Sequence, residues 1–215
     1  MAEDAPAAEL FRRVGEEMAG VLGPGIEHAI LRYEADETAT VLAGSSGPVP
    51  GGIVVGERLA LRGSGVSAQV YREQRPVRVD DYASATGDIA NHASKHKIRG
   101  AIGCPIVVTG RIWGCMVVAH HEDEPFPPDT ERRVAQFTEL VATALANAEA
   151  RGELQRLADE QAALRRVATL VAETVAPAEL FDAVIVEVAQ LLAGAQVGMA
   201  RYENCLLYTS DAADE

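Results

Sequence analysis

Two cysteines stand at matching distances from a turn in the most apolar stretch of the chain, IRGAIGCPIVVTGRIWGCMVVAHH (98–121). Thr109-Gly110 separates two runs rich in β-branched residues, and glycine at the second turn position is typical of a two-residue hairpin loop. Counting outward from that loop pairs Cys104 with Cys115 across the hairpin. Directly opposed cysteines are within reach of a disulfide, so the pair is a candidate for redox chemistry.

Two other interpretations of Cys104 and Cys115 stay open. Free cysteines are usually small buried hydrophobic residues. The predicted pair is also a hydrogen-bonded one, with Cα atoms about 5.5 Å apart, which disfavours a relaxed disulfide. Metal binding together with His120 and His121 is the third interpretation, although these histidines fall at the strand end, away from the cysteines. We expect packing to be the main role of both thiols.

Further candidate residues precede the hairpin. His92 and His96 are spaced i, i+4 in a polar segment that is expected to turn helical from about Asp88. Either imidazole could contact a cofactor, and solvated helix residues are the alternative. Tyr82 is a candidate for a residue that covers a pocket, with simple burial as the alternative. The chain has no P-loop, nucleophile elbow, HExxH or kinase signature.

Alternation along the hairpin divides its side chains between two apolar faces. The first face carries four candidate pocket residues: Cys104, Ile106, Trp113 and Cys115. The second face carries Gly103 and Gly114, whose small size suits close approach of helices. We therefore predict that the Trp113 face lines a pocket beneath the polar segment 80–96, and that the other face packs against the terminal helices.

Charge and composition exclude several classes of partner. The chain has 215 residues, with 19 Lys+Arg against 32 Asp+Glu and a net charge of -13. Nucleic acid and anionic membrane surfaces would repel such a protein, so we expect neither as a partner. The sequence contains no run of about 18 apolar residues and no signal peptide. Three cysteines make no disulfide framework, which favours a cytoplasmic location.

Hydrophobic periodicity predicts the elements that position these residues. They are, in chain order, a helix over 10–22, strands over 29–33 and 38–43, a helix over 65–73, a strand over 77–79, a helix from about 88, the hairpin, and a long helix after the prolines at 125–128. This order predicts an α+β fold, with an antiparallel sheet and helices packed on one face.

The long helix carries a coiled-coil-like apolar seam. Its two halves are out of phase by one residue across Arg151-Gly152, and a glycine inside a helix costs about 1 kcal/mol relative to alanine. We therefore predict a discontinuity there, with a first domain over 1–151 and a helical connector over 152–176.

An internal repeat follows the connector. The pattern AELF…RYE of residues 8–34 recurs at 178–203, so we expect a second, truncated copy of the first domain over 177–204. Residues 205–215 match the translation of a sequencing adapter codon by codon. We expect this tail to be non-native and the natural protein to continue past Asn204.

The order of elements, together with GCPIVVTGRIWGCMVVAHH and FPPDTERRVAQFTELVATALANAEAR, resembles GAF domains, most closely those arranged in tandem in bacterial sensor histidine kinases. The resemblance implies a six-stranded antiparallel sheet between terminal helices, an unknown small-molecule ligand in a pocket, and a signal relayed through the connector. It also implies a homodimer formed through the terminal and connector helices.

The motifs of the GAF subclasses are mostly missing. The chain lacks the NKFDE signature of cyclic-nucleotide GAF domains, and the segment DIANHASKHKIRG lacks the cysteine that attaches a bilin. His92 and His96 lie near the histidine that haem-binding GAF sensors use, but neither can be placed in register. The resemblance therefore leaves the cofactor unknown.

Three functions stay open on the sequence. The first is a sensory and dimerisation module, most consistent with the N-terminal part of a histidine kinase, and not itself an enzyme. The second is a redox enzyme of the free methionine sulfoxide reductase type, which would use Cys104 and Cys115. The third is a scaffold without a ligand in a diguanylate cyclase, phosphatase or transcriptional regulator.

Overall fold

The computed structural model describes residues 4–45, 54–82, 85–172, 177–191, 196–203 and 206–211. The chain divides into two compact units, Met1–Asn147 and Ala148–Glu215. Within the described residues, no helix is long and apolar enough to cross a membrane.

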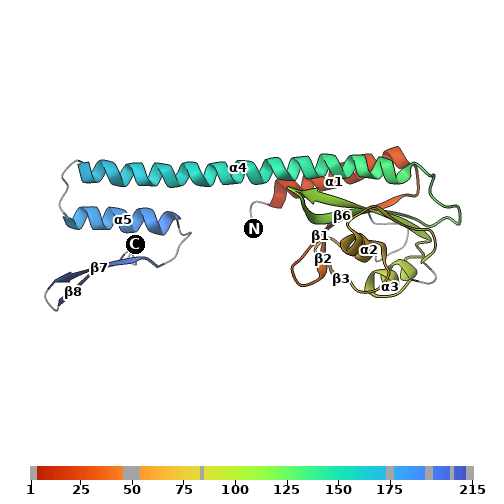
Figure 1. The fold of residues 1–215 in the computed structure, drawn as a ribbon, viewed down its shortest axis with the longest axis horizontal. Coiled ribbons are helices and arrows are strands. Elements are labelled where there is room, and N and C mark those ends of the chain that lie inside the picture. Colours follow the sequence, from red (N-terminus) through yellow and green to blue (C-terminus); the bar gives the residue numbers. More distant parts are fainter. Residues whose placement is uncertain are drawn as a thin grey trace. The chain divides into compact units, whose positions relative to one another are not determined.

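The first unit is built on a six-stranded antiparallel sheet with the strand order β3-β2-β1-β6-β5-β4 (Figure 1). Its strands are β1 (Glu27–Tyr33), β2 (Thr38–Gly44), β3 (Arg58–Ala60), β4 (Val77–Val79), β5 (Gly100–Val108) and β6 (Arg111–His120). Its helices are α1 (Asp4–Leu22), α2 (Val66–Glu73), α3 (Asp88–Lys95) and the first part of α4 (Thr130–Ala172). The predicted α+β fold with its six-stranded sheet and long following helix is confirmed.

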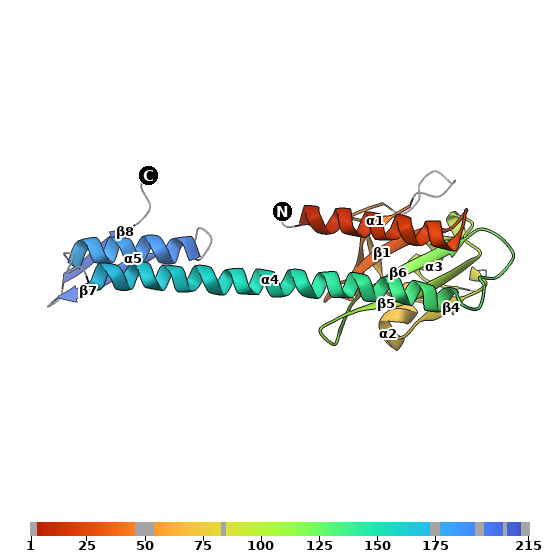
Figure 2. The same ribbon diagram turned by 90° about the horizontal axis from the view of Figure 1, so that it is seen from above.

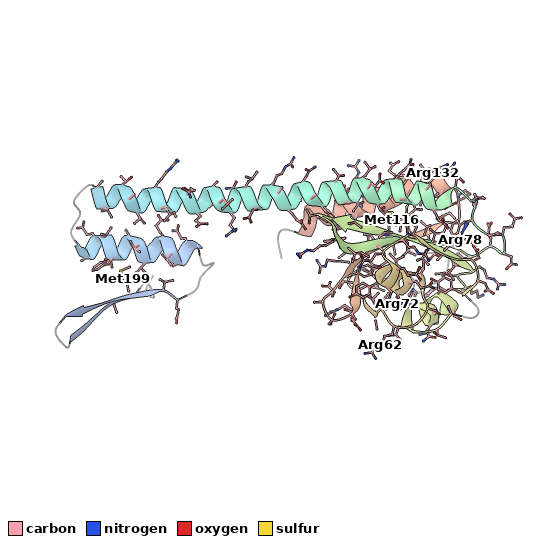
Figure 3. All side chains as sticks on the ribbon, in the orientation of Figure 1. Arg62, Arg72, Arg78, Met116, Arg132 and Met199 are labelled. Atoms are coloured by element: carbon pink, nitrogen blue, oxygen red, sulfur yellow. The ribbon has the colours of Figure 1, made fainter. Side chains whose placement is uncertain are left out.

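Helices cover both faces of this sheet, so the prediction that helices pack on one face only is wrong: the terminal helices lie on one face and two short helices on the other. Helix α1 and the first part of α4 lie side by side on one face, called here the helix face (Figures 1 and 2). Met18, Ile30, Met116 and Val134 are fully buried there and form its core, and Met116 is labelled in Figure 3. Helices α2 and α3 cover the other face, called here the cavity face, over a second core.

The β5–β6 hairpin contains a bulge that the sequence did not reveal. Val108 pairs with Arg111 and Val107 with Ile112, but Ile106 pairs with Gly114, so Trp113 is an extra residue in β6. Beyond the bulge, Cys104 therefore pairs with Met116, and Cys115 pairs with Pro105. The predicted pairing of Cys104 with Cys115 is wrong, because one inserted residue moves every later side chain of β6 to the other face.

Helix α4 is unbroken from Thr130 to Ala172. The discontinuity predicted at Arg151-Gly152 is wrong. Nothing lies within 4 Å of the position that a Gly152 side chain would take. A single exposed glycine costs only about 1 kcal/mol, which a helix of this length can bear.

The second unit contains the end of α4, helix α5 (Pro177–Leu191) and the paired strands β7 (Gly198–Glu203) and β8 (Leu206–Asp211). Ala163 and Ile185 are buried, and Arg166 forms an ion pair with Glu187 at 2.5 Å. The order of α5 and β7 is that of α1 and β1. The second domain copy and the adapter-derived tail stay predictions, and residues 192–195, 204–205 and 212–215 lie outside the described residues.

The central pairing of β1 with β6 requires glycine at position 114. A Cβ on Gly114 would overlap the carbonyl oxygen of Leu31 in the neighbouring strand. We expect Gly114→Ala to lower the free energy of unfolding of the first unit by about 1–3 kcal/mol, because backbone has to move. Urea unfolding followed by circular dichroism measures this change.

Gly152→Ala is the matched control, because that position is exposed and open. It should leave the stability unchanged or raise it by up to about 1 kcal/mol. Equal losses of stability in the two variants would contradict this account of Gly114.

Candidate functional site

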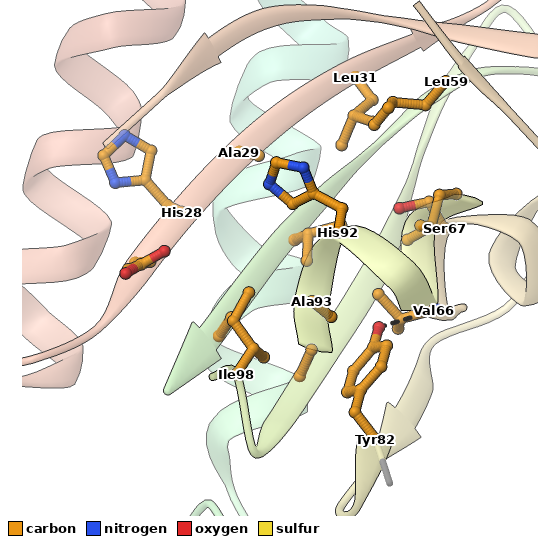
Figure 4. A pocket seen from close by; sticks show the side chains of 15 residues that line it. His28, Ala29, Leu31, Leu59, Val66, Ser67, Tyr82, His92, Ala93 and Ile98 are labelled. Carbon is orange, nitrogen blue, oxygen red and sulfur yellow. Dashed lines mark hydrogen bonds between the residues drawn. The ribbon is translucent and has the colours of Figure 1, made fainter. Parts of the chain in front are cut away.

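The cavity face holds a small, partly open space beneath α2 and α3, called here the inner cavity (Figure 4). Its volume is about 50 Å³. That is room for several water molecules or one compact apolar group. The residues that line it come from β1, β3, β5, β6, α2, α3 and the segment around Tyr82: Glu27, His28, Ala29, Leu31, Leu59, Val66, Ser67, Tyr82, Ile89, His92, Ala93, Ile98, Ala101, Val117 and Ala119.

Small side chains create this space. Ala29, Ala93, Ala101 and Ala119 stand on four different elements and are all buried. Leucine or valine at any of these positions would occupy part of the cavity. The walls are therefore apolar, and the polar groups on them are few, as is usual for sites that bind small molecules.

His92 brings an imidazole to the inner cavity from α3. Burial lowers the pKa of His92 below its usual range, and the neighbouring His96 lowers the pKa further. The two rings are stacked with centroids 4.3 Å apart and planes tilted by 32°. His92 is therefore a neutral imidazole at pH 7, able to donate or accept one hydrogen bond. His96 is buried behind it and does not line the cavity.

Tyr82 closes another wall and also caps a helix. Its phenolic oxygen accepts a hydrogen bond of 3.0 Å from the amide of Val66, the first residue of α2. The Val66 amide is one of the first-turn donors that have no partner within the helix, and Tyr82 satisfies it from outside the helix. Burial raises the pKa of Tyr82 to about 12. The phenol therefore keeps its proton. Because its oxygen accepts the bond from Val66, this proton can be donated to another group.

Glu27 contributes a carboxylate at the start of β1. Its Oε1 lies 2.5 Å from Nε2 of His121, and the opposite ring nitrogen of His121 lies 3.2 Å from the carbonyl oxygen of Lys97. This bridge fastens β1 and the end of β6 to the segment after α3. The Glu27 side chain is 15% exposed, so its charge is largely shielded from water.

The two cysteines lie on opposite faces of the sheet. Cys104 is on the helix face, with its Sγ 3.6 Å from the carbonyl oxygen of Glu131. Cys115 belongs to the core of the cavity face, but it does not line the inner cavity. Burial raises the pKa of Cys104 to about 12 and that of Cys115 to about 11. Buried neutral thiols on two sides of a sheet cannot act as a redox pair.

Trp113 and Ile106 also face the helices and not the cavity. The Trp113 ring packs against Phe11 of α1, with ring centroids 5.6 Å apart. Ile106 is fully buried in the same core. The prediction that the Trp113 face lines the pocket is therefore wrong. Gly103, predicted to meet the terminal helices, instead lies against Val66 and Val70 of α2.

Of the seven predicted site residues, the structure brings two, Tyr82 and His92, to the inner cavity. His96, Cys104, Ile106, Trp113 and Cys115 do not line it. Sequence reasoning missed Glu27 and Ser67, which add polar atoms to the wall. Within the described residues, no group of three histidine, cysteine or carboxylate side chains could hold a metal ion, so metal binding by the cysteines and His120-His121 gains no support.

The GAF domain family model matches residues 4–146, more than half of the chain. The chain belongs to the GAF domain family. No curated protein sequence matches it.

Several solved structures share its fold. The phycocyanobilin-bound GAF domain of a cyanobacterial phytochrome is 15% identical with a TM-score of 0.55, and the match covers 67% of this chain and 86% of that one. A phycoerythrobilin-bound GAF domain from a cyanobacterial phytochrome is 14% identical with a TM-score of 0.56, covering 70% and 91%. The Stigmatella aurantiaca phytochrome photosensory core module is 12% identical with a TM-score of 0.64, covering 96% of this chain and 45% of that one.

The residues present do not fit a bilin or a haem. Among the described residues, no cysteine lines the inner cavity or the wider polar cavity beside it, so a bilin has no attachment point, and the inner cavity of about 50 Å³ is far too small to enclose a tetrapyrrole ring beside His92. The bilins of these two GAF domains therefore do not carry over to this chain.

The burial of both thiols predicts their reactivity. In a Cys205→Ser background, we expect neither Cys104 nor Cys115 to react with a thiol reagent in the native protein, and both to react after unfolding. Titration with a chromogenic disulfide in buffer and in denaturant measures this difference. Native reaction of both thiols, or a disulfide between them, would revive the redox-enzyme hypothesis.

Proposed function

We propose that this chain is a small-molecule sensor and dimerisation module of a cytoplasmic signal-transduction protein, most consistent with the N-terminal part of a sensor histidine kinase. The observation that carries the proposal is the position of the inner cavity on the strands that also carry the helices. Ala29 and Val117 face the cavity, whereas their neighbours Ile30 and Met116 face α1 and α4.

This arrangement connects the cavity to the outgoing helix through one layer of backbone. Strands β1 and β6 pair directly, and their side chains alternate between the two faces. A ligand that pushes on Val117 or Ala119 also moves Met116 and Val118, because the backbone is shared. Close packing then transmits the shift to the first part of α4.

The later part of α4 supports dimerisation. Four apolar side chains recur there at coiled-coil spacing and are exposed: Leu154 (67%), Leu157 (43%), Leu164 (57%) and Val171 (58%). Glu160 and Arg165 flank this seam five residues apart. In a parallel homodimer, Glu160 of one helix faces Arg165 of the other, whereas an antiparallel pair would place like charges together. The proposed partner is therefore a second copy of the chain in parallel register.

The proposal of a histidine kinase as the output domain comes from the arrangement of domains that GAF-containing sensors share. The repeat of AELF…RYE supports a tandem arrangement of two GAF domains, and the 96% coverage by a phytochrome photosensory core module agrees with a multi-domain sensor. A diguanylate cyclase, phosphatase or transcriptional regulator is the alternative context.

Filling the inner cavity tests the proposed relay. Ala93 is buried on α3 against the cavity, and Ala93→Leu places three extra carbons where a ligand would sit. We expect the amides of residues 130–147 in α4 to change their hydrogen-exchange rates severalfold, because the sheet moves with the cavity wall. Exchange followed by mass spectrometry reads this out across the chain.

Ala35→Leu is the control, since Ala35 is exposed in the turn between β1 and β2. It should leave α4 unchanged. If Ala93→Leu changes the hydrogen-exchange rates in α3 but not in α4, the proposed transmission from the cavity to α4 is wrong. That result would favour a scaffold that does not respond to a ligand.

Charges on the seam test the dimer. We expect Leu157→Asp with Leu164→Asp to convert the dimer into monomers, because four carboxylates would meet in the apolar seam. Sedimentation velocity of the full chain measures the mass. Val186→Asp, at an apolar position of α5 that is 47% exposed, should leave the dimer intact. A native chain that sediments as a monomer would overturn this part of the proposal.

A further inference from the structure

A wider cavity lies beside the inner cavity and is called here the outer cavity. Its volume is about 430 Å³, and Tyr82 and Ile98 line both spaces. Its remaining lining is polar and includes Lys97, Arg99 and Ser94. The narrow apolar cavity and the wide polar cavity are therefore neighbours with Tyr82 and Ile98 at their common wall, and a ligand that passes between these two side chains would occupy both.

The outer cavity carries positive charge on a strongly acidic protein. The chain contains only two lysines, Lys95 and Lys97, and Arg99 follows directly. Lys97 is exposed and lines the outer cavity together with Arg99. Arg99 forms an ion pair of 3.1 Å with Asp123, whose side chain is 86% exposed. Such an exposed pair contributes little and can be exchanged for a ligand.

Two acidic groups also belong to this region. Asp81 lines the outer cavity. Glu27 lines the inner cavity and forms a hydrogen bond with His121, which lines the outer cavity. By count these two carboxylates balance Lys97 and Arg99, so a preference for an anion depends on where the charges stand: Glu27 is engaged by His121, whereas Lys97 and Arg99 are two residues apart on the segment that lines the outer cavity. A ligand with one negative charge, placed on the side of Lys97 and Arg99, suits this distribution.

The backbone at Lys97 is left-handed, which shapes the choice of a test variant. Lys97 has φ = 56°, in the left-handed region, directly after the C-cap of α3. The amides of Lys97 and Ile98 bond to the carbonyl oxygens of Ser94 and Ala93 at 3.1 and 2.9 Å. Glycine or asparagine usually fills this position, because most other side chains are disfavoured there. Glu37, Gln74 and Thr109 have the same conformation, so the backbone does not assign a role to Lys97, but it makes Lys97→Gly a variant that removes the side chain without straining the fold.

We propose that the ligand of these two cavities is a small amphiphilic anion. Its compact apolar group occupies the inner cavity among the alanines, and its anionic group lies in the outer cavity against Lys97 and Arg99. This inference rests on the proposed sensory function and adds the chemical class of the signal.

Three probes of the same shape and different charge test the proposal: 3-methylbutanoate, 3-methylbutanamide and 3-methylbutylamine. We expect the full chain to bind the carboxylate about tenfold more tightly than the amide, since a charge-assisted contact is worth that much, and not to bind the amine. Protein-observed NMR titration measures the three affinities. A higher salt concentration should weaken the binding of the carboxylate and leave the binding of the amide unchanged.

Lys97→Gly separates a ligand contact from a structural role. Glycine suits the left-handed backbone, so the melting temperature should stay the same or rise, while the preference for the carboxylate over the amide falls to within about twofold. Lys95→Gln is the matched control, because Lys95 is exposed on α3 and lines neither cavity. It should leave the preference unchanged.

The outcomes distinguish this inference from the function on which it rests. Equal binding of the carboxylate and the amide overturns the anionic ligand and leaves a sensor of neutral molecules. A preference that survives Lys97→Gly overturns the role of Lys97. If none of the probes binds, the inference is overturned, and the exchange experiment on Ala93→Leu decides separately whether the sensory function stands.

Discussion

The fold depends on burial of the β1, β6 and β5 strands on both sides. These strands separate two cores, one beneath α1 and α4 and one beneath α2 and α3. A strand between two apolar layers cannot slip by one residue without exchanging the contents of both cores. The bulge at Trp113 therefore affects the whole of β6 beyond it. It determines which side chains of this strand face the inner cavity and which face the helices.

The same double burial explains what the sequence could and could not predict. The short elements Val77–Val79 and the helix from Asp88 were predicted correctly, because turns and polar residues mark their ends. The bulge carries no such mark. Both faces of the hairpin are apolar, so its sequence has no alternation of polar and apolar side chains that an inserted residue would interrupt. Strand β3, with three residues paired only to β2, was not predicted at all.

The candidate site was predictable only in part, for a related reason. Tyr82 and His92 were found because polar side chains stand out in a segment next to an apolar hairpin. The alanines that make the inner cavity did not stand out, because a space is a property of four elements together and not of one sequence motif. The predicted cysteine pair followed from counting residues in an ideal hairpin, and it failed at the inserted residue.

The hydrogen bond between Tyr82 and Val66 has a consequence for any bound molecule. The phenol accepts from the end of α2 with its oxygen and keeps its own proton for another partner. When such a group donates outward, its oxygen becomes a stronger acceptor, because chains of hydrogen bonds polarise one another. An acceptor atom on a ligand would thus tighten the cap of α2. Ligand affinity and the rigidity of this helix are then two measures of one cooperative chain of bonds, and each rises with the other.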